Sequence, residues 1–269
     1  MRLTPAAGSP LDAAALKAAL VRPGSLWRDV SVLAETCSTN EDLLAAARRG
    51  APEGTVLVAE LQTAGRGRMG RTWVSVPGTA LTFSVLLRPV AAAPASKGWV
   101  PLLAGLAVAC ALRSLAGVDA RLKWPNDVLV NGAKLAGILA EQAGDAIVVG
   151  AGINVCTGQD ELPSASATSL ALQGATCTDR EVLLIGLLGQ LEHWYLRWAY
   201  APSGDAAACG LRQEYLRLSA TVGRDVRVSL PGGRTLAGTA CNVDEVGRLV
   251  VKSADALVAV SAGDVVHVR

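Results

Sequence analysis

The sequence predicts an α+β fold, with a central mixed or antiparallel sheet flanked by helices and a small β-barrel domain at the C-terminus. Strand patterns between residues 126 and 155 are joined by short turns, which favours antiparallel pairing over a βαβ crossover. After residue 218 only short strand patterns and turn sequences follow, as is typical of a small barrel. We therefore expect an N-terminal extension with one short helix (1–30), a central catalytic domain (31–218) and a C-terminal β domain (219–269).

The first part of the chain alternates between helix and strand patterns. An Ala-rich helix is predicted over Leu11–Val21, closed by Pro23 and Gly24. Ser38 opens a second helix that ends at Gly50, and Glu41 completes an S-x-x-E capping box with it. Strands are predicted at Val30–Ala34, Gly54–Glu60 and Ala80–Arg88.

The longest apolar run is Trp99–Leu112, and we interpret it as a buried core helix. It is shorter than the roughly 20 residues that cross a bilayer, and Pro101 stands near its start, where a helix tolerates proline.

A hairpin is the clearest pattern in the middle of the chain. The dipeptide Asn131-Gly132 tolerates the positive φ of a tight turn, and it separates strand patterns over Asn126–Val130 and Lys134–Gln142. Further elements are predicted as a strand over Ala146–Val155, helices over Asp179–Ala199 and Ala206–Leu218, and strands over Val226–Leu230, Arg234–Val243, Arg248–Lys252 and Leu257–Val268.

Composition excludes several classes of function. The 25 Lys+Arg residues nearly balance the 23 Asp+Glu residues, and no basic block suggests a nucleic-acid-binding arm. Asp12 and Lys17 interrupt the N-terminal apolar stretch, so it is not a secretory signal. The six cysteines lack zinc or C-x-x-C spacing, which fits a reduced cytoplasm, and we expect no membrane association. With two histidines, a His-based triad or a multi-His metal site is not expected.

The loop over residues 65–71 (GRGRMGR) matches G-x-G-x-x-G, the dinucleotide-binding fingerprint. That fingerprint requires a helix directly after the glycines and an acidic residue about twenty positions further on. Here a strand-like and turn-like segment follows, and the region over residues 85–90 has no acid. The alternating glycines and arginines instead suit an anion, although a flexible, solvated basic loop has the same composition.

A second polar cluster, Lys123-Trp124-Pro125-Asn126-Asp127, leads into the predicted hairpin. Pro125 favours an extended Trp124, and polar side chains at the ends of paired strands can converge on one pocket. Taken alone, the cluster is better explained as the start of a strand with a buried tryptophan.

Several stretches together resemble the biotin–protein ligases, in order and spacing, over residues 30–269. The resemblance implies a fold of the class II synthetase and biotin ligase type with a small SH3-like C-terminal domain. The motifs that carry it are Ser38-Thr39-Asn40, residues 62–71 (QTAGRGRMGR), residues 123–127 (KWPND), residues 134–139 (KLAGIL) and residues 152–155 (GINV).

The resemblance implies a reaction in two steps. The biotin carboxylate attacks the α-phosphate of ATP to give biotinyl-5′-adenylate, and a lysine of a biotin carboxyl carrier domain then displaces AMP. ATP and biotin are substrates, and Mg²⁺ is expected on the phosphates. The biotin site is implied to comprise Ser38, Thr39, Asn40, Gln62, Gly65, Arg66, Gly67, Arg68, Lys134 and Gly137.

The nucleotide and catalytic groups follow from the same motifs. Arg66, Arg68 and Lys134 are implied to offset the repulsion of two anions, and Asp127 to orient and deprotonate the incoming amine; Lys134, Arg68 and Asp127 are the expected catalytic residues. The ATP site is implied to comprise Arg68, Arg71, Trp73, Asn126 and Asn154. A structural role remains open for Trp73, as a buried tryptophan, and for the two asparagines, as turn or strand-end residues.

The expected partner is the carrier domain of a biotin-dependent carboxylase. About thirty residues precede the catalytic region, too few for a helix-turn-helix module, so we expect no specific DNA binding. Two alternatives stay open: a lipoate or octanoate ligase of similar fold, and a non-catalytic, biotin-sensing DNA regulator.

Overall fold

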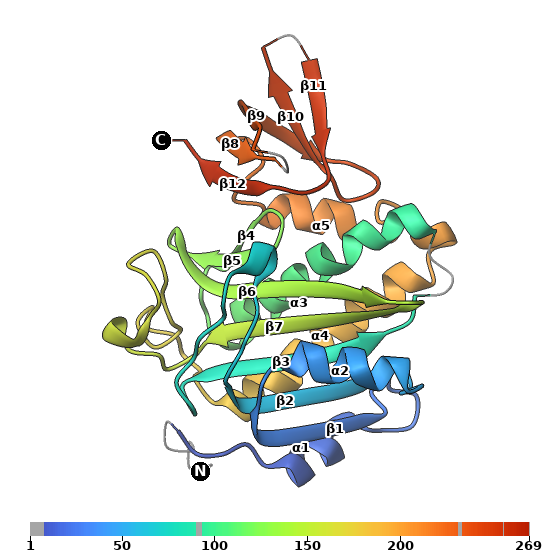
Figure 1. The fold of residues 1–269 in the computed structure, drawn as a ribbon, viewed down its shortest axis with the longest axis vertical. Helices are drawn as coiled ribbons and strands as arrows, with labels where there is room; N and C mark the ends of the chain where they lie inside the picture. Colours follow the sequence, from blue (N-terminus) through green and yellow to red (C-terminus); the bar gives the residue numbers. More distant parts are fainter. Residues whose placement is uncertain (1–7, 90–92, 231–232, 255, 269) are drawn as a thin grey trace.

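The computed structural model of the protein describes residues 8–89, 93–230, 233–254 and 256–268. Its strands form a seven-stranded sheet and a five-stranded sheet, and helices cover both faces of the larger one (Figure 1). The predicted α+β class, with a mixed sheet flanked by helices, is therefore confirmed.

The seven-stranded sheet has the order β1-β2-β3-β7-β6-β5-β4. Strands β1 (Asp29–Thr36) and β2 (Thr55–Gln62) are parallel because helix α2 (Thr39–Arg48) connects them, and every other pair is antiparallel. The remaining strands are β3 (Ala80–Leu87), β4 (Arg121–Lys123), β5 (Asp127–Val130), β6 (Ala133–Ala143) and β7 (Ala146–Asn154).

The hairpin between β5 and β6 forms as predicted. Asn131 (φ 50°) and Gly132 (φ 80°) both adopt the left-handed conformation that a primed turn requires. Strand β7 then continues antiparallel to β6, so these three strands form the meander that the short turns predict.

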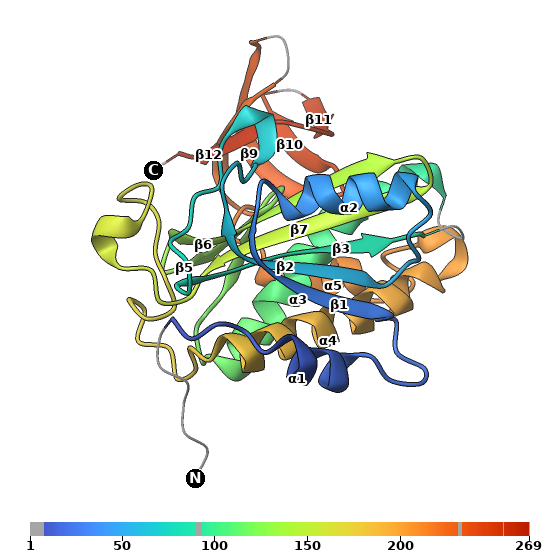
Figure 2. The same cartoon turned by 60° about the horizontal axis from the view of Figure 1, so that its bottom comes forward.

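Different helices cover the two faces of the large sheet. Helices α3 (Val100–Leu115) and α4 (Arg180–Ala199) pack on one face, α1 (Ala13–Leu20) lies beside β1, and α2 covers the other face (Figures 1 and 2). The predicted core helix is confirmed, because α3 buries most of its residues. The stretch Pro94–Leu115 is long and apolar enough to cross a membrane, but 67% of its most apolar window is buried inside the protein.

Two predicted elements are wrong in their bounds. Helix α5 is Leu211–Leu218 rather than starting at Ala206, because Gly210 has a left-handed conformation (φ 78°) that breaks the chain direction just before it. The segment before Gly210 forms a separate turn, in which the Asp205 carboxylate accepts the amide hydrogens of Ala207 and Ala208.

The predicted strand Leu257–Val268 is two strands. Strand β11 (Ala256–Val260) pairs with β10 (Leu249–Ser253), whereas β12 (Asp264–His267) pairs with β8 (Asp225–Ser229). The chain must therefore change partners between them, and it does so at Gly263, where a Cβ atom would lie 2.7 Å from Val228.

The five-stranded sheet is open rather than closed. Its order is β11-β10-β9-β8-β12, with β9 at Thr235–Val243, and no pairing joins β11 to β12 among the described residues. Two tryptophans of the large domain donate to its backbone: Trp124 to Gly247 O (3.1 Å) and Trp99 to Glu245 O (2.8 Å). The predicted domain boundary near residue 219 stays a prediction.

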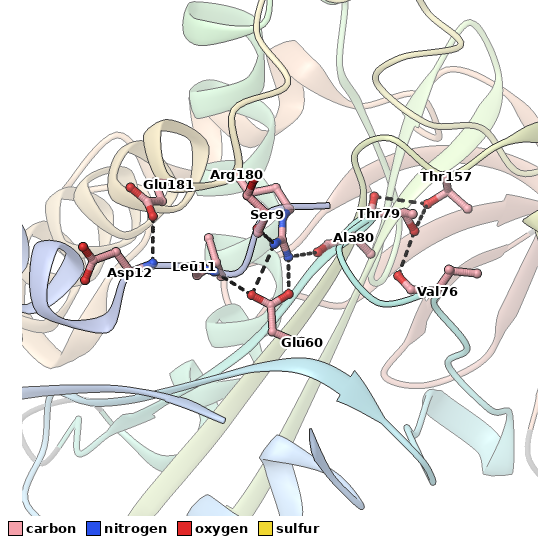
Figure 3. Close-up of polar contacts among 10 residues, drawn as sticks. All are labelled: Ser9, Leu11, Asp12, Glu60, Val76, Thr79, Ala80, Thr157, Arg180 and Glu181. Carbon is pink, nitrogen blue, oxygen red and sulfur yellow. Dashed lines mark hydrogen bonds and ion pairs between the residues drawn. The ribbon is translucent and has the colours of Figure 1, made fainter. Parts of the chain in front are cut away.

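A buried ion pair fastens the N-terminal segment to the large sheet. Arg180 on α4 pairs with Glu60 on β2 at 2.6 Å, and their side chains are 6% and 13% exposed. Arg180 also donates to Ser9 O (2.5 Å) and Ala80 O (3.3 Å), and Glu60 accepts from Leu11 N (2.8 Å) (Figure 3). Because each charge has several partners, the cost of removing the pair from water is offset.

Candidate active site

One pocket lies on the α2 side of the large sheet and is built from the start of α2, the end of β2, the loop after β2, and β3, β6 and β7. It brings together most of the site residues that the sequence predicts: Ser38, Thr39, Asn40, Gln62, Arg66, Gly67, Arg68, Arg71, Trp73, Asn126, Lys134 and Gly137. Gly65, Asp127 and Asn154 are not among its lining residues.

The N-terminus of α2 forms one end of the pocket. Ser38 caps the helix by accepting a long hydrogen bond from Glu41 N (3.5 Å), as the capping-box pattern predicts for the serine. Gln62, at the end of β2, accepts the Thr39 amide hydrogen at 2.8 Å. Ser38, Thr39 and Asn40 are 2–4% exposed, so this end offers neutral, largely desolvated donors and acceptors.

The glycine–arginine loop folds back on itself as a short hairpin. Gly67 N donates to Arg71 O (2.7 Å), and Trp73 N donates to Gly65 O (2.8 Å). Its tip is a single 3-10 turn, η1 (Arg68–Gly70), so no α-helix follows the glycines and the dinucleotide-binding reading is excluded. Met69 stands at this tip with a left-handed backbone (φ 58°) and a 64% exposed side chain, outside the pocket lining.

The three loop arginines have different partners. Arg66 pairs with Glu41 of α2, and Arg71 pairs with Asp264 of β12 at 2.8 Å; both arginine side chains are more than half exposed. Arg68 donates to Asn126 Oδ1 at 3.4 Å. Burial lowers the pKa of Arg68, and the nearby Asp127 carboxylate opposes that shift. Arg68 is thus the loop cation held in the least solvated surroundings.

Strands β5 and β6 bring Lys134 and Asp127 together. Lys134 Nζ lies 2.6 Å from Asp127 Oδ1, and the two side chains are 35% and 15% exposed. Asn126, just before β5, donates to Ile138 O on β6 (2.9 Å), which fixes its amide toward Arg68. Trp124 is 2% exposed, so the cluster supplies both a buried tryptophan and site residues.

Trp73 lies against glycines on both neighbouring strands. A Cβ atom on Gly152 of β7 would lie 2.2 Å from the indole ring, and one on Gly137 of β6 would lie 3.6 Å from it. These two glycines are paired across the sheet, so together they make room for the ring. Trp73 therefore packs over these glycines beside Lys134, whose ammonium group would lie 3.3 Å from a Cβ atom on Gly137.

Asn154 sits at the end of β7, away from the pocket lining. It is 5% exposed, and its amide donates to Thr168 O at 2.9 Å. Sequence reasoning also missed several lining residues, among them Thr82, Gly150 and Gly152. The available signal was polar or glycine residues at alternate positions of buried strands, which lie on one face.

Comparison with known proteins identifies the family that the chain resembles. Residues 34–157 match the family described as "Biotin/lipoate A/B protein ligase family", and residues 221–268 match the "Biotin protein ligase C terminal domain". The biotin–[acetyl-CoA-carboxylase] ligase of Mycobacterium tuberculosis is 44% identical over 97% of both chains. The bifunctional ligase/repressor BirA of Escherichia coli is 34% identical over 83% of this chain and 69% of its own length.

Among solved structures, the biotin protein ligase of Aquifex aeolicus in complex with biotin and ATP is similar, with a TM-score of 0.74 and 28% identity. That comparison covers 90% of this chain and 100% of the Aquifex chain.

Proposed function

Because the chain belongs to the biotin protein ligase family, we propose that it activates biotin with ATP and attaches it to a lysine of a carrier protein. In the first step a biotin carboxylate oxygen bonds to the α-phosphorus of ATP, and pyrophosphate leaves. In the second step a lysine amine attacks the acyl carbon of the adenylate, the bond to AMP breaks, and the amine loses a proton.

One observation carries this proposal: a single pocket has neutral polar groups at one end and cations at the other. Thr39 and Gln62 lie at the first end, and Arg68 and Lys134 lie at the second. The Lys134 ammonium lies beside Gly137 of β6, and Leu139, two positions further along that strand, contacts Asn40 at the neutral end. A ligand with a neutral polar ring, an apolar chain and a reacting carboxylate fits that order.

We assign the biotin head group to the neutral end. Its ureido ring carries N–H donors and a carbonyl acceptor, and Ser38, Thr39 and Gln62 supply groups of both kinds. Arg66 and Gly67 lie beside this end in the loop, so they are proposed to close over the bound ligand. Asn40 belongs to the same wall, and its contacts are considered below.

Repulsion between two anions is the physical difficulty of the first step. At about 4 Å and an effective dielectric near 20, one pair of unit charges repels by roughly 4 kcal/mol. Arg68 and Lys134 face this part of the pocket and offset that repulsion as the α-phosphate gains charge. Arg71 and Asn126 are proposed to bind phosphate oxygens, and Trp73 to stack on adenine.

Asp127 is the proposed proton acceptor of the second step. It lies 2.6 Å from Lys134, so its carboxylate is held next to the place where the reacting carboxyl group would sit. The incoming lysine is a cation that must lose its charge before it attacks, and a carboxylate favours its approach.

Magnesium is proposed to arrive on the phosphates of ATP. None of the pocket-lining residues is an acid, and Asp127 beside the pocket is already paired with Lys134. Among the described residues no group of three or more His, Cys, Asp or Glu could hold a metal ion. These side chains fit a protein-made magnesium site poorly, so no step is assigned to one.

The proposed acceptor is a biotin carboxyl carrier domain, since the Mycobacterium tuberculosis relative is named for acetyl-CoA carboxylase. We also propose that the protein acts in the cytoplasm and without specific DNA binding. The 25 Lys+Arg residues nearly balance the 23 Asp+Glu residues, so the chain has no strong positive charge that would attract DNA. A gel shift that showed tight, sequence-specific binding at stated salt would contradict this last part.

Exchange of labelled pyrophosphate into ATP tests the proposed function. The purified protein is expected to catalyse exchange with biotin and not with lipoate or octanoate, which separates it from a lipoate ligase. Lys134→Ala is expected to slow exchange by about 10²- to 10³-fold, because it removes a cation from the reacting phosphate. Lys252→Ala, an exposed lysine of the small sheet, is the matched control. An absence of biotin-dependent exchange would refute the proposal.

A further inference from the structure

Behind Thr39 lies a row of polar side chains that the proposed reaction does not use. Thr39 Oγ1 is 2.7 Å from Ser84 Oγ, which donates to Asn40 Oδ1 at 2.6 Å. Asn40 Nδ2 in turn donates to Glu141 Oε2 (2.7 Å) and to Leu139 O (3.3 Å). Ser84 and Glu141 are not among the lining residues, so the row leads away from the pocket wall, through the buried Ser84 and Asn40 to the partly exposed Glu141.

The acceptors at the far end fix the direction of this row. An ionised Glu141 and the Leu139 carbonyl only accept hydrogen bonds, so the Asn40 NH₂ group must face them and its Oδ1 must face Ser84. Asn40 Oδ1 carries no hydrogen, so the proton in its contact with Ser84 belongs to Ser84. Ser84 then has no proton left for Thr39 and can only accept from it.

The Thr39 hydroxyl is left with two neighbours that accept its proton. One is Ser84 Oγ, and the other is Gln62 Oε1 at 3.0 Å, which already accepts the Thr39 amide hydrogen. Both are protein atoms. Whichever of them receives the proton, Thr39 presents only lone pairs to a ligand in the pocket.

The fold keeps the part of this row next to the pocket dry and closely packed. Ser84 is 0% exposed, Thr39 2% and Asn40 4%. Ser84 on β3 and Leu139 on β6 are both paired with Gly150 of β7, so all three positions lie on one face of the sheet. A Cβ atom on Gly150 would lie 2.3 Å from Asn40 Oδ1, so the glycine provides the space that Asn40 occupies.

We propose that Ser84, Asn40 and Glu141 hold the proton of Thr39 inside the protein and so make Thr39 an obligate acceptor, which selects a ligand head group that presents an N–H at that point. This inference rests on the proposed function and refines it. Ser84 and Glu141 are positioning residues, because they act on the ligand through Thr39. A ring that offers an acceptor there places its lone pair against a lone pair of the Thr39 oxygen. That oxygen is then left without a donor, which is costly in a buried site.

Two biotin analogues test this, cyclic carbamates in which one or the other ureido N–H is replaced by a ring oxygen. Their dissociation constants and that of biotin are measured by calorimetry on the wild-type protein and four variants. For wild type we expect the dissociation constant of one analogue to be about 10²-fold or more above that of biotin. In Ser84→Ala the Thr39 proton keeps only Gln62 Oε1 at 3.0 Å, an atom that already accepts the Thr39 amide hydrogen, so the hydroxyl turns toward the ligand more readily. In Glu141→Ala the Asn40 amide keeps only its long contact with Leu139 O (3.3 Å), so it turns over more readily. Both variants are expected to lower the ratio of the analogue's dissociation constant to that of biotin at least tenfold, mainly because the analogue binds more tightly.

Two further variants serve as matched controls. Glu141→Gln retains an acceptor for Asn40 and is expected to keep the wild-type ratio. Ser169→Ala removes another fully buried serine hydroxyl outside the pocket lining, and it too is expected to keep the ratio. Thermal unfolding confirms that each variant is folded.

Three results would overturn the inference. The first is that wild type binds biotin and both analogues equally well. The second is that Ser84→Ala and Glu141→Ala weaken the binding of biotin and of the analogue equally, as a purely structural role predicts. The third is that Glu141→Gln behaves like Glu141→Ala. Biotin-dependent pyrophosphate exchange by wild type keeps these results separate from the proposed function, which fails only if that exchange is absent.

Discussion

Lys134 and Asp127 stand at opposite ends of the β5–β6 turn region, and the hairpin brings their charges to within 2.6 Å. The two residues are proposed to serve different half-reactions. Lys134 stabilises negative charge on the phosphate while the adenylate forms, whereas Asp127 accepts a proton when the carrier lysine attacks. A change that preserves shape but removes the carboxylate charge therefore separates the steps.

Asp127→Asn is expected to slow the second step more than the first. The amide keeps the size of Asp127 but accepts protons poorly, so transfer from isolated biotinyl-adenylate to a carrier domain should fall about 10²-fold. Biotin-dependent pyrophosphate exchange should stay within about tenfold of wild type, since Lys134 remains charged. Single-turnover transfer and exchange are measured on the same preparation, and an equal loss in both would contradict the separate roles.

At the scale of single residues, the sequence predicted the motif residues that line the pocket but not the residues that contact them from outside the pocket. Lys134, Arg68 and Thr39 stand in recognisable stretches, and the structure brings them to one pocket. Ser84 occurs in an ordinary buried strand, and Glu141 resembles a solvated residue near a strand end. Their importance arises from contacts with Asn40, 44 and 101 positions away, which no local pattern encodes.

Strand pairing decides which glycines matter to the site. In β7, Gly150 and Gly152 are two positions apart and so point to the same face, where one faces Asn40 and the other faces Trp73. Glycine in a strand interior normally weakens the strand, so both positions give up some local stability for space on the pocket side.

Gly152→Ala is expected to displace the Trp73 ring. The added methyl group would lie 2.2 Å from the indole, and relieving that overlap costs about 1–3 kcal/mol of folding free energy or forces the ring to move. The KM for ATP should therefore rise more than the KM for biotin in the exchange assay. Gly189→Ala in α4 is the matched control, because nothing lies within 4 Å of its added methyl group. A Gly152→Ala enzyme with unchanged KM values would show that Trp73 does not bind nucleotide.

Elements with strong local signals were predicted well, and those set by distant partners were not. The β5–β6 hairpin follows from Asn131-Gly132, and α3 follows from its long apolar run. The division of Leu257–Val268 into β11 and β12 depends instead on which strand each half pairs with, β10 or β8. Both halves have the same strand composition, so only the tertiary fold reveals the break between them.

The molecule as a whole joins its two sheets through side chains next to the site. Arg71 of the glycine–arginine loop pairs with Asp264 of β12, and Trp124 donates to Gly247 of the small sheet. Thr221 lies between the two parts: its hydroxyl accepts from Trp124 N at 3.0 Å and lies 3.2 Å from His267 Nε2. His267 is therefore placed where a change of charge would act on the junction of the sheets.

Stability is expected to fall below about pH 6.5 partly through this histidine. Burial, followed by the nearby positive charges of Lys123 and Arg224, lowers the pKa of His267 in the folded protein. The unfolded chain, with a histidine pKa of about 6.5, binds the proton at a higher pH than the folded chain does. The contribution is therefore fully present above about pH 6.5 and is lost as the pH falls toward the folded pKa.

His267→Gln removes the titrating group and keeps a polar partner for Thr221. Measured by denaturant unfolding between pH 7.5 and 5.5, the free energy of unfolding of wild type should drop more steeply than that of the variant. Carboxylates that titrate in this range are common to both proteins, so the difference between the curves isolates His267. Parallel curves for wild type and His267→Gln would mean that His267 has the same proton affinity in the folded and unfolded chains, and that protonation at this junction does not loosen the two sheets.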